Sequence, residues 1–172
     1  MHVSWSELYW QRLTPLHAIL WPLSIIFELS FKLKRTAYHY GLLATTRYPI
    51  PLIIVDGITV NGIEKSALTI WLVNFLSSNG LRPAVITCSY SDNYQEFPTE
   101  VTTSSDKTQV GDNALFLAFH CSKQNCPVWI GQDSSTVGLD LLKANPDRNV
   151  LICDGGLHDY RLHRDLEILV LD

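Results

Sequence analysis

The chain has 172 residues, of which 47% are hydrophobic and 17% charged, and its formal net charge is −4. This length suits one domain with a sizeable core and leaves little room for a second. The negative charge gives no electrostatic reason for nucleic-acid binding, so we expect no nucleic-acid partner.

The cysteines and histidines carry no metal-site pattern. No two cysteines form a CxxC pair, and the six histidines lack the spacing of zinc ligands. Free, buried thiols of a reducing compartment are the favoured interpretation, with a Cys121–Cys126 disulfide as the alternative.

Residues 1–48 are predicted to form an N-terminal helical segment. Thr14-Pro15 is a typical helix start, and the residues from Leu16 to Leu33 are apolar almost all round. Pro22 should kink this helix. The segment has a basic end, and Gly41 is placed to end the helix as its C′ residue.

Several roles are open to this apolar helix. A cleaved signal peptide fits poorly, because the basic residues follow the apolar run and no small-residue cleavage site appears. A helix spanning a bilayer is possible by length, at roughly 27 Å, but it would carry Pro22 and Glu28. A helix lying in the membrane interface, with its cations toward lipid headgroups, explains more of the composition. We therefore expect a peripheral or monotopic membrane association, with an ordinary core helix as the alternative.

Residues 49–172 show alternating strand and helix patterns. The predicted strands are continuous apolar runs, which favours a mostly parallel α/β sheet with helices on both faces. Trp71 and Phe75, four residues apart, are predicted to lie in the core. The predicted strands are Pro51–Val55, Pro83–Thr87, Val128–Gly131, Asn149–Cys153 and Glu167–Leu171, and the predicted helices are Lys65–Ser78, Ala114–Phe119 and Ser134–Ala144.

A damaged phosphate-binding loop joins the first of these strands to the first helix. Strand, glycine-bearing loop, Lys-Ser and helix in this order are the layout of a P-loop, whose amides and helix N-terminus hold phosphates. Lys65 would meet the outer phosphates of the ligand, and the Ser66 hydroxyl would bind magnesium. Thr59 and Gly62 are the further predicted contacts of this phosphate-bearing cofactor. The residue before the lysine is Glu64, where a P-loop has glycine.

Two aspartates are further candidates. Asp154 follows an apolar strand, where a magnesium-holding carboxylate sits in P-loop enzymes, although Asp-Gly-Gly is also a simple turn. Asp112 begins an apolar helix and is a candidate catalytic residue, with N-capping as its plain explanation. His158 and Asp159 are expected to be solvated loop residues.

Parallel sheets bind ligands beyond the carboxyl ends of their strands. That rule places the loops Asp56–Ser66, Cys88–Asp92 and Asp154–Tyr160 at one edge. The chain stops at Asp172, directly after a predicted strand, so we expect a C-terminal part to be missing.

In order and spacing, these motifs resemble the N-terminal half of the tetraacyldisaccharide 4′-kinase family, over nearly the whole chain. The resemblance implies a P-loop fold and ATP- and magnesium-dependent phosphorylation of a glucosamine disaccharide lipid, a step of lipid A biosynthesis. It also implies a site on the cytoplasmic face of the bacterial inner membrane. The segments that carry it are Leu13-Thr-Pro-Leu16, Gly41-Leu-Leu43, Pro51-Leu-Ile-Ile-Val55, Ile58-Thr-Val60, Lys65-Ser66, Gly111-Asp112, Asp154-Gly-Gly-Leu157, Tyr160-Arg-Leu162 and Arg164-Asp-Leu-Glu-Ile168.

The departures from the family pattern point to lost activity. The family loop ends in Gly-Lys-Thr, where this chain has Glu64-Lys-Ser66, and the family's Gly-Asp-Glu-Pro is here Gly111-Asp-Asn-Ala114. The second aspartate and the histidine of the family's Asp-Asp-Gly-Leu-Gln-His-Tyr, used in magnesium binding and catalysis, are Gly155 and Asp159. We therefore expect weak ATP binding and a weakened or inactive kinase. The alternative is a non-catalytic, truncated paralogue that acts as a membrane-associated binding or structural protein.

Overall fold

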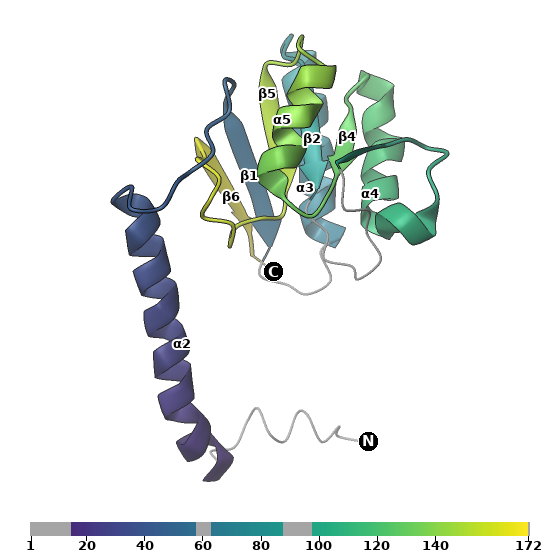
Figure 1. Cartoon of the computed structure of the whole chain (residues 1–172). Helices are drawn as coiled ribbons and strands as arrows, with labels where there is room; N and C mark the ends of the chain where they lie inside the picture. Colours follow the sequence, from purple (N-terminus) through teal and green to yellow (C-terminus); the bar gives the residue numbers. More distant parts are fainter. Residues whose placement is uncertain (1–14, 58–62, 88–97, 172) are drawn as a thin grey trace, which may run out of the picture. The chain divides into compact units, whose positions relative to one another are not determined.

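The computed structural model describes residues 15–57, 63–87 and 98–171 (Figure 1). The chain divides into two compact units, one comprising the residues up to Ala44 and the other beginning at Thr45.

The first unit is built on one long helix, α2 (Pro15–His39), which carries Pro22 inside it. The helix continues past the apolar run, which ends at Leu33, through the predicted basic end. Gly41 has a φ of 70°, its N–H donates to Tyr38 O at 3.1 Å, and the N–H of Leu42 donates to Ala37 O at 2.9 Å. This pair of bonds is the glycine-dependent cap that satisfies terminal carbonyls, so the predicted role of Gly41 is confirmed. Thr14 lies outside the described residues.

Most of the described side chains of α2 are exposed. An ion pair joins Lys32 Nζ to Glu28 Oε1 at 2.7 Å, one turn apart on the helix. Within the described part of the chain, no helix combines the length and the apolar character needed to cross a bilayer. The exposed large apolar residues of α2 are Trp21, Ile25, Ile26, Phe27, Leu29, Phe31 and Leu33.

The second unit contains a six-stranded sheet in the order β3-β4-β2-β5-β1-β6. All neighbouring pairs are parallel except β3 and β4, so the predicted mostly parallel sheet is confirmed. The short antiparallel edge strand β3 was not predicted. The strands are β1 (Leu52–Gly57), β2 (Pro83–Thr87), β3 (Thr99–Val101), β4 (Val128–Ile130), β5 (Val150–Asp154) and β6 (Leu166–Val170).

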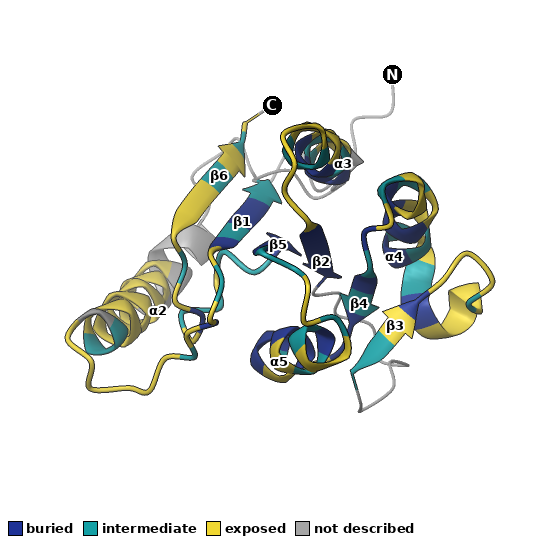
Figure 2. Ribbon diagram, turned by 90° about the horizontal axis from the view of Figure 1, so that it is seen from above, coloured by how far each residue is buried: buried dark blue, intermediate teal, exposed yellow. Residues whose placement is uncertain are grey.

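Helices cover both faces of this sheet, as predicted. Figure 2 shows α5 on one face and α3 and α4 on the other. Their bounds are α3 Ile63–Ser78, α4 Lys107–Cys121 and α5 Ser134–Ala144, with a short 3₁₀ helix at Ser122–Gln124. Every residue of β2 and β5 is buried, which explains why these strands are apolar throughout instead of alternating.

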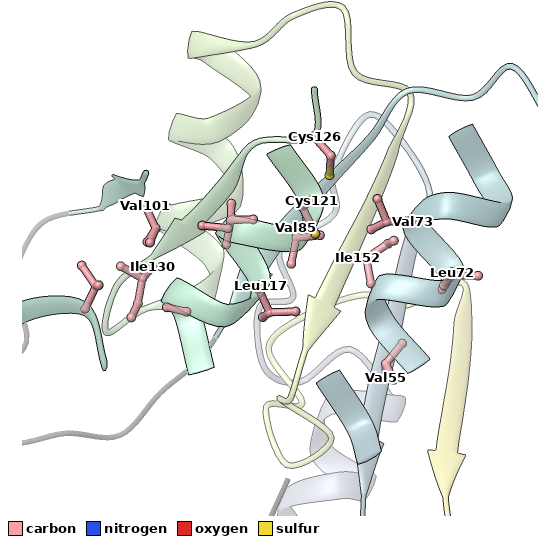
Figure 3. Close-up of a cluster of buried hydrophobic side chains, with 14 residues drawn as sticks. Val55, Leu72, Val73, Val85, Val101, Leu117, Cys121, Cys126, Ile130 and Ile152 are labelled. Atoms are coloured by element: carbon pink, nitrogen blue, oxygen red, sulfur yellow. The ribbon is translucent and has the colours of Figure 1, made fainter. Parts of the chain in front are cut away.

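The larger apolar core lies between the sheet and the α3–α4 layer. Val55 and Ile152 from the strands meet Val73 of α3 and Leu117 of α4 there (Figure 3). The described cysteines, Cys121, Cys126 and Cys153, are free and buried, as the favoured interpretation expected, and the Cys121–Cys126 disulfide does not form.

Two further predictions about helices are wrong. Trp71 and Phe75 stack on one another at 5.2 Å between ring centroids, but on the outer side of α3, where they are 58% and 49% exposed. Helix α4 begins well before the predicted Ala114, because Asp106 caps it by accepting from Thr108 N.

Candidate phosphate-binding site

The candidate site lies at the carboxyl edge of the sheet. Strands β1, β2, β5 and β6 are parallel, so all of them end at this edge. Helix α3 begins there after β1, and its first-turn amides and positive dipole end are available to an anion. In open parallel sheets this is the edge where ligands bind.

Asp154, the last residue of β5, is the centre of the site. Its side chain is fully buried. Thr69 Oγ1 donates to its Oδ1 at 2.9 Å, and Asn113 Nδ2 donates to its Oδ2 at 2.8 Å. Lys65 Nζ lies 3.8 Å from the same Oδ2 atom. Ser66 Oγ is a third donor, at 3.3 Å from Oδ2, so the carboxylate is held by an ammonium group and three hydrogen-bond donors.

Helix α3 supplies one polar stripe to this cluster. Ser66 and Thr69 are three residues apart, so they share a face of the helix, and both are fully buried beneath it. Thr69 Oγ1 also lies 3.1 Å from the carbonyl oxygen of Lys65. Glu64, the residue before Lys65, is exposed in the first turn of α3.

Helix α4 supplies Asn113 through a break in its backbone. Gly111 has φ 78° and ψ 162°, a conformation open to glycine that interrupts the helix. Just beyond this break, Asn113 Oδ1 accepts a 2.6 Å hydrogen bond from Ser66 Oγ, while its amide nitrogen donates to Asp154. One carboxamide thus bridges the serine of α3 and the aspartate of β5.

Burial dominates the electrostatics of Asp154. Desolvation raises the pKa of its carboxyl above the ordinary value. The Lys65 charge and the hydrogen bonds from Asn113, Thr69 and Ser66 pull the pKa back down, but not fully. Lys65 is the cation nearest to this carboxylate, and its side chain is 17% exposed, so it can face an incoming anion.

The structure brings together only some of the predicted site residues. Lys65, Ser66 and Asp154 form one contact cluster. Asp112 lies apart from this cluster. Its side chain is 72% exposed, and its carboxylate forms an ion pair with Lys107 Nζ at 2.8 Å. Thr59 and Gly62 lie outside the described residues.

Sequence reasoning missed Thr69 and Asn113 as members of the site. Both are neutral, and neither belongs to a general catalytic motif. A signal existed for Thr69, since it is a polar residue one turn after Ser66 within the apolar stretch from Ala67 to Val73. The signal for Asn113 was its position directly after Asp112, because the family that the chain resembles has a glutamate at position 113.

The loop after β5 is fixed by its own contacts. Gly155 and Gly156 have φ values of 93° and 104°. Asp159 is only 16% exposed, and both its oxygens accept 2.8 Å hydrogen bonds from Arg161. Burial works to raise the pKa of Asp159, but the hydrogen bonds and charge of Arg161 lower it overall. The prediction of a solvated Asp159 is wrong.

The groups predicted to bind magnesium, Ser66 and Asp154, are hydrogen-bonded to neighbouring side chains in this structure. Magnesium needs oxygen ligands with open lone pairs and keeps several of its waters. Here the two Asp154 oxygens accept from Thr69 and Asn113, and the Ser66 hydroxyl is engaged by Asn113. The described residues also contain no group of three or more His, Cys, Asp or Glu side chains placed to hold a metal.

Comparisons with known proteins agree with one another. The family model described as tetraacyldisaccharide-1-P 4′-kinase matches residues 16–172. The chain is 44% identical over 170 residues to a tetraacyldisaccharide 4′-kinase of Nitrosomonas eutropha, covering 99% of this chain and 42% of that protein. It is 40% identical over 164 residues to the Nitrosococcus oceani enzyme of the same name, covering 95% of this chain and 47% of that one.

A solved structure shares the fold. The apo form of LpxK from Aquifex aeolicus in complex with ATP superposes with a TM-score of 0.75 at 25% identity, over 90% of this chain and 48% of that one. The chain thus spans a little under half the length of these relatives. The match along residues 16–172, together with this likeness of sequence and fold, shows that the chain belongs to the tetraacyldisaccharide-1-P 4′-kinase family.

Proposed function

We propose that this chain is a weakened or inactive member of the lipid A 4′-kinase family that still binds the phosphate end of ATP. The observation that carries the proposal is the cluster of Lys65, Ser66 and Asp154 at the N-terminus of α3. An ammonium group beside a helix N-terminus is an anion-binding arrangement. The Aquifex aeolicus relative has ATP bound. Thr59 and Gly62 are proposed as further ATP contacts.

We expect ATP to bind weakly because of Glu64. Its carboxylate stands in the first turn of α3, where the phosphates would lie. It is exposed, so its repulsion of one phosphate charge at close range is about 1 kcal/mol, or roughly fivefold in affinity.

The residues proposed for catalysis, Asp154 and Asp112, are poorly placed for proton transfer, since Asp154 is buried and hydrogen-bonded to its neighbours. Asp112 faces away from Asp154 and is paired with Lys107. Position 155 has no side chain, and Asp159 is committed to Arg161. A general base must reach the proton that it abstracts, and such help is typically worth about 10²–10⁴ in rate.

The proposed acceptor class is a membrane-borne glucosamine disaccharide lipid, the tetraacyldisaccharide of the family's name. Helix α2, with its exposed apolar residues and basic end, is proposed to lie on the cytoplasmic face of the bacterial inner membrane. In this proposal, residues 1–48 associate with the membrane and residues 49–172 form the P-loop kinase-like domain.

A non-catalytic membrane-associated binding protein is the second candidate. The buried, hydrogen-bonded state of Asp154 favours it, because a carboxylate so enclosed acts as a structural group. The two candidates differ in whether any phosphate is transferred.

Transfer of labelled γ-phosphate to the tetraacyldisaccharide lipid in detergent micelles tests the proposal. A full-length family kinase is the positive control, and Lys65→Ala is the contamination control. We expect no transfer above the Lys65→Ala background at saturating ATP, together with measurable ATP binding by calorimetry. Transfer that disappears in Lys65→Ala would overturn the inactive assignment. Absence of ATP binding at millimolar concentration would leave only the non-catalytic candidate.

A further inference from the structure

The side chain of Asn113 contacts both groups predicted to share a magnesium ion, and the Ser66 hydroxyl itself lies 3.3 Å from Asp154 Oδ2. Its oxygen faces the Ser66 hydroxyl at 2.6 Å, and its nitrogen faces Asp154 Oδ2 at 2.8 Å. Reversing the amide would set its oxygen against the carboxylate and its nitrogen against the hydroxyl. The orientation of the amide in the structure is therefore the one in which both contacts are attractive.

This carboxamide performs the two tasks of a hydrated cation. A metal-bound water donates to an aspartate, as the Asn113 nitrogen does here, and a P-loop serine gives its oxygen to the metal. In this chain the Ser66 hydroxyl lies 2.6 Å from the Asn113 oxygen and 3.3 Å from Asp154 Oδ2. A cation at the same place would have to break both hydrogen bonds and would gain no additional carboxylate.

Of the two adjacent residues Asp112 and Asn113, only Asn113 reaches the site. Asp112 points to solvent and pairs with Lys107, while Asn113 points to Asp154. The break at Gly111 sets this division, because the helix restarts there. The neutral member of the pair faces the buried carboxylate, and the charged member does not.

We infer that Asn113 occupies the place of the divalent ion between Ser66 and Asp154, so that this chain binds phosphate groups at Lys65 without magnesium. That the phosphate groups belong to ATP rests on the proposed function. That Asn113 excludes the divalent ion rests only on its contacts with Ser66 and Asp154. Asn113 is thus a positioning residue that holds Ser66 and Asp154, and it sets the metal dependence of the site.

Two measurements on the full chain test this inference. The first is Mn²⁺ binding without nucleotide, followed by loss of the free-ion electron paramagnetic resonance signal. The second is ATP affinity by calorimetry in excess Mg²⁺ and in EDTA. For the natural sequence we expect no Mn²⁺ binding in the micromolar range and ATP affinities that agree within about twofold between the two conditions.

The test variant is Asn113→Asp, which places a second carboxylate beside Asp154 with almost no change of shape. We expect Mn²⁺ affinity to rise at least about tenfold, because two carboxylates and a hydroxyl form a hard-cation site. In EDTA the carboxylates repel one another, so Tm should fall by roughly 5–10 °C, and Mg²⁺ should restore most of it. Asn74→Asp, on the exposed side of α3, makes the same chemical change away from the site and should alter neither readout.

Asn113→Ala guards against a folding failure of the charged variant, since it removes the bridge and adds no charge. We expect its ATP affinity to become dependent on Mg²⁺ by about fivefold or more. The inference is overturned if the natural sequence binds Mn²⁺ as tightly as Asn113→Asp, or if Asn113→Asp and Asn74→Asp behave alike. If the natural sequence binds no ATP, the proposed function fails, and the Mn²⁺ comparison still decides the role of Asn113.

Discussion

Tyr48 lies directly against Gly138 of α5, and its ring fills the space that a side chain there would need. A Cβ added at Gly138 would come within 2.6 Å of Tyr48 Cε1. The Tyr48 hydroxyl donates to Ser134 O at 2.7 Å, which fixes the ring over the first turn of the same helix. The contact joins the segment before β1 to the helix that covers this face of the sheet.

Gly138→Ala should therefore destabilise the protein. Alanine in a helix is ordinarily better than glycine by about 1 kcal/mol. Overpacking here should reverse that sign and cost roughly 1–3 kcal/mol in the free energy of unfolding. Urea unfolding measures the change. In a Tyr48→Leu background the cost should shrink, as a double-mutant cycle would reveal. A stabilising Gly138→Ala would show that the ring does not occupy this space.

Glu64→Gln should tighten ATP binding by roughly fivefold, because it removes the carboxylate from the first turn of α3 and keeps the helix-forming side chain. The same change should lower stability by about 0.3–1 kcal/mol, since an acid at a helix N-terminus interacts favourably with the dipole. Calorimetric titration and urea unfolding give the two numbers. Glu100→Gln, on exposed β3, is the charge-matched control and should leave affinity unchanged.

The buried Asp154 should give the pH profile of stability a falling slope. Its folded-state pKa is raised, so above the ordinary aspartate pKa of 3.8 the unfolded chain loses this proton before the folded chain does. Its contribution is greatest below that value and is lost as pH rises through the folded pKa. The free energy of unfolding of the natural sequence minus that of Asp154→Asn should therefore decrease as pH rises across this window.

Asp106 supplies the opposite sign as a control. Hydrogen bonds from the backbone N–H and side chain of Thr108 lower its pKa, so its contribution is present above the unfolded pKa and is lost as pH falls through the folded pKa. The free energy of unfolding of the natural sequence minus that of Asp106→Asn should increase as pH rises. Urea unfolding of the three proteins at a series of acidic pH values checks both slopes. Parallel profiles would contradict the assignment for Asp154.

Membrane association through α2 should depend on its apolar residues. Ile26 and Leu33 are exposed and seven residues apart, so they share one side of the helix. Ile26→Asp with Leu33→Asp should abolish sedimentation with liposomes that contain anionic lipid. The matched control, Ser24→Asp with Thr36→Asp, adds the same charge at exposed polar positions and should retain most of the binding. Deleting residues 1–40 should also prevent sedimentation, and equal sedimentation of the deletion variant would exclude α2 as the anchor.

The parts of the fold that were predicted from the sequence are those where burial imposes a pattern. Strand β2 and helix α5 have the predicted bounds, because a strand buried on both faces must be apolar and Asn145-Pro146 stops the helix. Strand β3 escaped detection because three residues with a polar sequence at a sheet edge carry no such pattern.

The start of α4 and the bridging role of Asn113 depend on tertiary structure. An apolar pattern indicates where a helix is buried, and this pattern begins at Ala114, whereas the helix is capped at Asp106. The direction of Asn113 follows from the φ of Gly111, which the sequence permits but does not require. Asp112 was chosen as a site residue because it is charged, whereas in the structure its neutral neighbour Asn113 contacts Asp154.

The backbone at Gly155 and Gly156 makes position 155 unfavourable for an aspartate. An aspartate at position 155 would enter a chain held at φ 93°, at a cost of about 1–2 kcal/mol. The Gly155 amide also donates to Val55 O at 2.8 Å, so the backbone there is held by the sheet. An aspartate at position 155 therefore requires an accompanying change of loop shape, and Gly155→Asp alone should lower the stability of the protein.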